Sequence, residues 1–75
     1  MAKHPNLSRL TVFDIARIKK FANITELQEQ IFNHLCKDKL DYAIMQDLHI
    51  SNRKYYENKP IVFDKVSKVA PETFM

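Results

Sequence analysis

The chain has 75 residues, of which 45% are hydrophobic and 28% are charged, and it contains no Gly, no Trp and one Cys. This length suits one domain with one hydrophobic core. The absence of Gly argues against P-loops and dinucleotide folds, which need Gly where the backbone meets phosphate, and against the tight hairpins of small β-barrels. We therefore expect a small, single, all-α domain.

The lone Cys36 excludes an internal disulfide and a Cys-based zinc cluster, and it favours a reducing compartment. No apolar run approaches the ~20 residues of a membrane span, and the first residues are polar, unlike the apolar core of a signal peptide. We expect a cytoplasmic protein with no membrane partner. The expected organisation is a flexible arm over 1–10, a domain over 11–70 and a tail over 71–75.

The formal net charge is +3, and its distribution is uneven. Residues 1–24 carry five basic residues and one acidic residue, residues 25–50 carry two and five, and residues 51–75 carry five and three. An acidic middle between basic ends is compatible with one face that meets a polyanion. Solvated helix surfaces produce similar balances, so charge alone favours nucleic acid only slightly.

Capping signals predict the first two helices. Thr11 with Asp14, and Thr25 with Gln28, have the spacing of a capping box at a helix start. After the second signal, hydrophobic residues recur at helical spacing along one stripe, at Leu27, Ile31 and Leu35. The two helices are predicted over 12–22 and 26–37.

A third helix is predicted over 40–47, and it ends before His49, where the chain must turn. A fourth helix is predicted to begin at Asn52 because Ser51, directly before it, is a good N-cap.

The end of the fourth helix is ambiguous in the sequence. Pro60 prevents an unbroken helix unless the helix kinks. Val62, Val66 and Val69 keep helical spacing, which predicts a kinked continuation or a separate fifth helix. A two-stranded wing over 61–69 is the alternative, although no Gly is present for its turn.

The segment DYAIMQDLHISNRKYYENK, over 41–59, has the spacing of a DNA-binding helix-turn-helix. Four hydrophobic residues, Ile44, Leu48, Ile50 and Tyr55, would lock the two helices together at the corner. The opposite side of the second helix would then be exposed near its start. Tyr56, adjacent to Tyr55, is expected on that exposed side.

The exposed residue types suit a DNA groove. Asn can pair with adenine and Arg with guanine, whereas hydroxyl groups and Lys contact phosphate. The candidate DNA-binding residues are Ser51, Asn52, Arg53, Lys54, Tyr56, Lys59, Lys37 and Lys39. The plainer interpretation is that Arg53 and Lys54 are solvated surface, and that Lys37 and Lys39 serve capping and solubility.

These residues resemble a known family, the ArpU/RinA-type phage transcriptional regulators. ISNRKYYENK is similar to their I-S-x-x-T/K-Y-Y-x-x-K signature, and DYAIMQDLHIS to their D-Y-x-I-x-x-x-L-G-I-S. The resemblance covers about residues 27–70, with its specific part in 41–59. It implies a sigma-factor-like helix-turn-helix whose second helix contacts promoter DNA upstream of late genes. The implied contacts are Ser51, Asn52, Arg53 and Lys54, followed by Tyr56.

Three positions depart from the family pattern: His49 replaces the turn Gly, Met45 replaces a small residue, and Pro60 interrupts the helix that follows. His tolerates a left-handed backbone conformation, so we expect the turn to survive.

The sequence offers no catalytic arrangement. His34 and Cys36 are two residues apart on a predicted helix and therefore face different sides, so they cannot form a nucleophile pair or chelate a metal. The three His residues have no metal-ligand spacing. We expect no enzyme activity, no cofactor and no metal.

The sequence thus predicts a double-stranded DNA-binding protein that places the helix starting at Ser51 in the major groove. The resemblance implies a phage or prophage transcription regulator that acts in the cytoplasm of a bacterial host cell. RNA polymerase and a second copy of the chain are candidate partners. The alternative is a small protein-interaction module, such as a phage inhibitor or adaptor, that keeps the fold without binding DNA. A third option is a DNA-packaging recognition subunit, which would assemble into a ring.

Overall fold

A computed structural model describes Leu7 and residues 10–71. Over that part of the chain it contains four α-helices and no β-strand. The helices are α1 (Val12–Phe21), α2 (Glu26–Cys36), α3 (Asp41–Leu48) and α4 (Asn52–Val69). The predicted all-α fold is confirmed, and each predicted start lies within one residue of the observed one. The alternative of a wing over 61–69 is wrong, because these residues continue α4.

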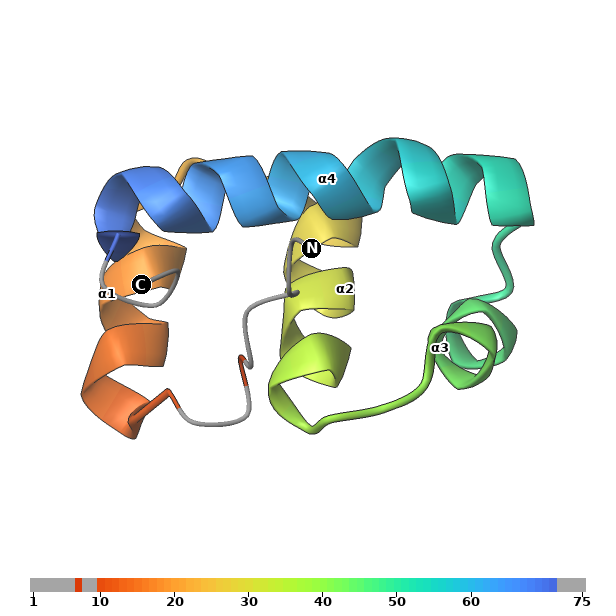
Figure 1. The fold of residues 1–75 in the computed structure, drawn as a ribbon, viewed down its shortest axis with the longest axis horizontal. Helices are drawn as coiled ribbons and strands as arrows, with labels where there is room; N and C mark the ends of the chain where they lie inside the picture. Colours follow the sequence, from red (N-terminus) through yellow and green to blue (C-terminus); the bar gives the residue numbers. More distant parts are fainter. Residues whose placement is uncertain (1–6, 8–9, 72–75) are drawn as a thin grey trace, which may run out of the picture.

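Helix α4 is the longest helix, and the other three helices are arranged along it (Figure 1). Figure 1 shows the three short helices on one side of it, with α3 beside its first turns, α2 across its middle and α1 beside its last turns. An 18-residue helix is about 27 Å long, close to the 30 Å of the molecule's longest dimension. Helix α2 also contacts α3. One long helix therefore links all the elements.

Both predicted capping boxes form. The N–H of Asp14 donates to Thr11 Oγ1 at 3.1 Å, and the N–H of Thr11 donates to Asp14 Oδ2 at 3.2 Å. The pair Thr25 and Gln28 repeats this exchange, with both distances at 3.2 Å. These bonds satisfy backbone N–H groups that a helix start otherwise leaves unpaired.

The connections between helices turn without glycine. Each contains one residue with a left-handed backbone: Asn23 (φ 52°), Asp38 (φ 59°) and His49 (φ 55°). Asn, Asp and His are the non-Gly residues that populate this region most readily. The tolerance expected of His49 is confirmed. The turn is closed there by the N–H of Ile50, which donates to the carbonyl of Met45 at 3.1 Å.

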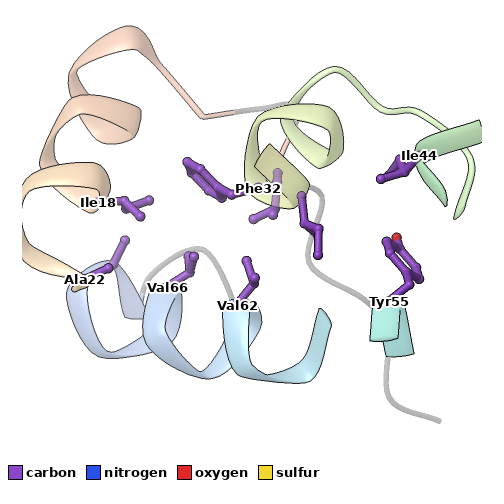
Figure 2. Close-up of a cluster of buried hydrophobic side chains, with 10 residues drawn as sticks. Ile18, Ala22, Phe32, Ile44, Tyr55, Val62 and Val66 are labelled. Carbon is purple, nitrogen blue, oxygen red and sulfur yellow. The ribbon is translucent and has the colours of Figure 1, made fainter. Parts of the chain in front are cut away.

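The core lies between α4 and the three shorter helices (Figure 2). Its buried hydrophobic residues are Leu7, Ile18, Ala22, Ile31, Phe32, Ile44, Tyr55, Val62, Val66 and Ala70. Figure 2 shows Val62 and Val66 pointing toward α1 and α2, whereas Tyr55 faces Ile44 of α3. The second half of α4 thus holds α1 and α2, and its first half holds α3.

The burial of Val62 and Val66 explains why α4 continues through Pro60. Both valines are fully buried and Pro60 is exposed. Burying one Val side chain stabilises the fold by about 1.5–3 kcal/mol, whereas a proline inside a helix costs about 3 kcal/mol. Two valines therefore offset the proline, whose ring lies on the solvent side.

A polar network connects α2 to the middle of α4. Gln28, which is buried, donates from Nε2 to Asn58 Oδ1 at 3.3 Å. Its Oε1 accepts from Lys65 Nζ at 3.0 Å, and the same ammonium donates to the carbonyl of Asn23 at 2.9 Å. The buried amide is therefore satisfied on both sides, as a buried polar group must be to avoid a large cost.

The expected flexible arm over 1–10 contains an anchored residue. Leu7 is buried in the core, and its carbonyl accepts from the N–H of Leu10 at 3.2 Å. The rest of the arm, 1–6 and 8–9, and residues 72–75 of the expected tail lie outside the described residues. Of the helices that the structure describes, none is long and apolar enough to cross a lipid bilayer.

Candidate nucleic-acid interface

Helices α3 and α4 form the predicted helix-turn-helix pair, joined by three residues, 49–51. Ile44 and Tyr55 are fully buried, and Leu48 and Ile50 pack against the core while staying partly exposed. This is the interior pattern expected from the sequence. It fixes the start of α4 against α3 and turns the opposite side of α4 toward solvent.

Asp41, the first residue of α3, connects the two helices through polar contacts. Tyr55 Oη donates to its Oδ1 at 2.7 Å. Lys59 Nζ donates to Oδ1 at 3.0 Å and to Oδ2 at 3.2 Å, and Tyr56 Oη lies 3.5 Å from Oδ2. All three donors come from α4, so this carboxylate holds the helix pair in one relative position.

The surroundings of Asp41 favour its charged form. Partial burial alone would raise the pKa of its carboxyl, but the hydrogen bonds from Tyr55 and Lys59 and the positive charge of Lys59 outweigh burial, and the pKa is lowered. Burial and the bond to Asp41 raise the pKa of Tyr55, which therefore remains a hydrogen-bond donor.

Lys59 is occupied within the fold, contrary to the sequence-based expectation of a phosphate contact. Its side chain is only 12% exposed, and its ammonium lies 5.8 Å from the ring centroids of both Tyr55 and Phe63. Lys39 forms a 2.6 Å ion pair with Asp47. Both acidic residues of α3, Asp41 and Asp47, are thus neutralised by lysines, which removes a repulsion that would oppose phosphate.

The exposed face at the start of α4 contains most of the predicted site. Asn52, Arg53, Lys54 and Tyr56 are all exposed. Arg53 Nε donates to Glu57 Oε1 at 3.0 Å, one turn further along the helix. Lys54 makes no ion pair within the described part of the chain.

Ser51 serves the helix itself. Its Oγ accepts from the N–H of Lys54 at 3.2 Å, as the N-cap of α4. The remaining candidates, Lys37 and Lys39, precede α3 in the chain, whereas the exposed residues at the start of α4 follow α3. Lys37 is the C-cap residue of α2, and its side chain is exposed.

Asn52 adjoins a hollow of about 580 Å³. This hollow was not predicted from the sequence. Its lining residues are Tyr42, Met45, Gln46, His49, Ile50 and Asn52. Tyr42, Met45 and Gln46 recur at i, i+3 and i+4, a spacing that places them on one face of α3, and His49 follows that helix as its C-cap residue. The sequence therefore contained a signal for this surface, although it could not reveal that Asn52 completes it.

His34 and Cys36 are both partly buried. Burial lowers the pKa of His34, and its Nδ1 is buried without a hydrogen-bond partner among the described residues. Burial raises the pKa of the Cys36 thiol to about 11, which keeps it protonated at neutral pH. The described residues contain no group of three or more His, Cys, Asp or Glu side chains that could hold a metal ion.

Comparison with known proteins assigns no family to this arrangement: no family model, no curated protein and no solved structure matches the chain. The resemblance of residues 41–59 to phage regulators therefore stays a prediction.

Proposed function

We propose that this protein binds double-stranded DNA and that it places the start of α4 in the major groove. The observation that supports the proposal is the α3–α4 corner. There Ile44 and Tyr55 are buried, while Asn52, Arg53, Lys54 and Tyr56 are each exposed. This combination of a buried corner and an exposed polar second helix is what a helix-turn-helix needs for base contacts.

The proposed contacts differ in kind. Asn52 and Arg53 contact base edges, because their amide and guanidinium groups match adenine and guanine. Lys54 contacts phosphate. The hydroxyl group of Tyr56 lies 3.5 Å from Asp41 Oδ2, at the outer limit of a hydrogen bond, and contacts phosphate or sugar in place of that weak bond. Lys37 and Lys39 supply a weaker positive charge beside α3. Lys59 is left out of the proposed contacts because Asp41 occupies it.

The proposed biological role is transcription regulation in a phage or prophage, by the resemblance of residues 41–59 described above. A single domain of this size covers few base pairs, so useful specificity requires a second copy on a palindromic site or a polymerase bound alongside.

The direct test measures binding of the full chain to random-sequence DNA duplexes at ~50 and ~200 mM salt. With about three phosphate contacts, affinity should fall about 40-fold over that range. Lys54→Ala should weaken binding to all sequences. Lys68→Ala, which removes one positive charge from the other end of the same helix, should leave binding almost unchanged.

Two results would contradict the proposal. One is the absence of binding at ~50 mM salt. The other is equal weakening by Lys54→Ala and Lys68→Ala, which would mean that only overall charge attracts DNA.

The second candidate function is a protein-interaction module, and exposed hydrophobic side chains of α1 favour it. Val12, Phe13 and Phe21 of that helix are exposed, with Phe13 at 86%. Hydrophobic side chains this exposed are typical of a surface that meets a protein. This candidate predicts no binding to duplex DNA, and a protein complex that Phe13→Ser disrupts while the helical content is unchanged.

A further inference from the structure

We propose that Glu57 is a positioning residue that directs Arg53 toward a guanine base and away from phosphate. The proposal rests on the DNA-binding function above and adds a base preference to the same site.

The geometry comes from one turn of α4. Arg53 and Glu57 are four residues apart, and both point away from the core, with side chains 89% and 61% exposed. The contact uses one particular nitrogen, Nε, which donates to Glu57 Oε1 at 3.0 Å. The guanidinium group is thus held at its inner edge, next to the helix.

The remaining donors suit guanine. A guanidinium group has five N–H donors in a rigid plane, and the bond to Glu57 uses the one on Nε. The two terminal nitrogens keep their hydrogens and form the outer edge of the group. Two parallel bonds from such an edge match O6 and N7 of guanine in the major groove.

The charge of Glu57 disfavours the competing contact. A carboxylate beside Arg53 repels a phosphate that approaches the same place, whereas a base edge has no net charge. Lys54, the next residue, makes no ion pair within the described residues and so remains suited to phosphate. Arg53 therefore supplies base preference, and Lys54 supplies salt-dependent affinity.

The experiment selects bound sequences from a random duplex pool with the full chain and four variants. Arg53→Ala removes the guanidinium group, and Glu57→Ala removes the oxygen that orients it. Glu57→Gln keeps an acceptor oxygen but removes the charge. Asp64→Ala is the matched control, because Asp64 forms the same i,i+4 pair, with Lys68 at 3.2 Å, near the other end of α4.

The wild type should prefer G·C at one position by roughly 5- to 150-fold over other pairs. Arg53→Ala and Glu57→Ala should both lose that preference, and Glu57→Gln should keep part of it. Asp64→Ala should keep it in full. Circular dichroism of each variant should show unchanged helical content.

Other outcomes would overturn the inference. If Arg53→Ala loses the preference and Glu57→Ala keeps it, Glu57 does not position Arg53, and DNA binding itself stands. If the wild type binds DNA without any base preference, the inference about Glu57 is wrong as well, and DNA binding itself stands. If the wild type binds no DNA, both the proposed function and this inference are wrong.

Discussion

Asp41 shows how one residue can determine whether its neighbours are available for function. Its carboxylate accepts from Tyr55 and Lys59, so the ammonium of this lysine is engaged within the fold. The ion pairs of Lys39 and Arg53 are more exposed, so they hold these two side chains less strongly. The sequence alone does not show which of these basic side chains is held by a distant carboxylate and which is available for another contact.

We predict that Asp41→Asn lowers the free energy of unfolding at pH 7 by about 1–3 kcal/mol, because the charged hydrogen bonds from α4 are lost. Chemical denaturation measures this change. Asp47→Asn, which breaks a more exposed pair on the same helix, should cost clearly less than Asp41→Asn. Equal losses in the two variants would contradict a special role for Asp41.

The same residue predicts part of the acid sensitivity. The pKa of Asp41 in the fold lies below its ordinary value of 3.8. Folding therefore favours the ionised form, and this contribution is complete above pH 3.8 and is lost as the pH falls through the lowered pKa. Stability measured over that window should fall less steeply in Asp41→Asn than in the wild type.

At the scale of elements, α4 combines two tasks in one helix. Its first turns present the exposed polar face, and its last turns bury Val62, Val66 and the following Ala70. Pro60 lies between the two parts. Because proline has no N–H, the carbonyl of Tyr56 lacks the donor that a helix would normally place four residues later.

We predict that Pro60→Ala raises the free energy of unfolding by about 1–3 kcal/mol, since it restores this N–H and removes the clash of the ring. Thermal and chemical denaturation both measure the change. Ser67→Ala removes one exposed hydrogen bond, from Oγ to the carbonyl of Asp64, and favours the helix slightly. It should change stability by less than about 0.5 kcal/mol. A loss of stability in Pro60→Ala would mean that the ring makes packing contacts that outweigh its effect on the helix.

At the scale of the whole molecule, the α3–α4 corner and the α1–α2 core are joined through α4. Gln28 adds polar contacts to Asn58 and Lys65, between the two regions. A small domain whose parts share one helix should unfold as a single unit. The proposed DNA-binding face therefore depends on hydrophobic contacts far from it.

Val66→Ala tests this coupling. The variant should lower the free energy of unfolding by about 1.5–3 kcal/mol through lost burial in the α1–α2 core. All three tyrosines, Tyr42, Tyr55 and Tyr56, lie in α3 and the first turns of α4, and the chain has no Trp. Tyrosine fluorescence thus reports on the corner, whereas circular dichroism reports on every helix.

Both signals should shift together in Val66→Ala. Two separated transitions, with the tyrosine signal unchanged, would show that the corner folds independently of the α1–α2 core.

The sequence by itself determined the features that depend on neighbours within one helical turn. Thr11 and Thr25 located two helix starts through capping boxes, and Ser51 located the start of α4. A left-handed turn at His49 was expected because His49 stands where the resembling family has a turn Gly, and His tolerates that backbone conformation. Ile44 and Tyr55 were identified as interior positions because helical periodicity separates one face from the other.

Only the tertiary structure decided the features that depend on distant partners. Whether α4 continued past Pro60 depended on burial of Val62 and Val66 against α1 and α2. Whether Lys59 was free depended on Asp41, 18 residues earlier. The energies that settle such questions come from burial and charge pairing between elements, which no pattern of adjacent residues specifies. The sequence could therefore name candidate DNA-binding residues, but the folded chain determined which of their side chains are engaged within the fold.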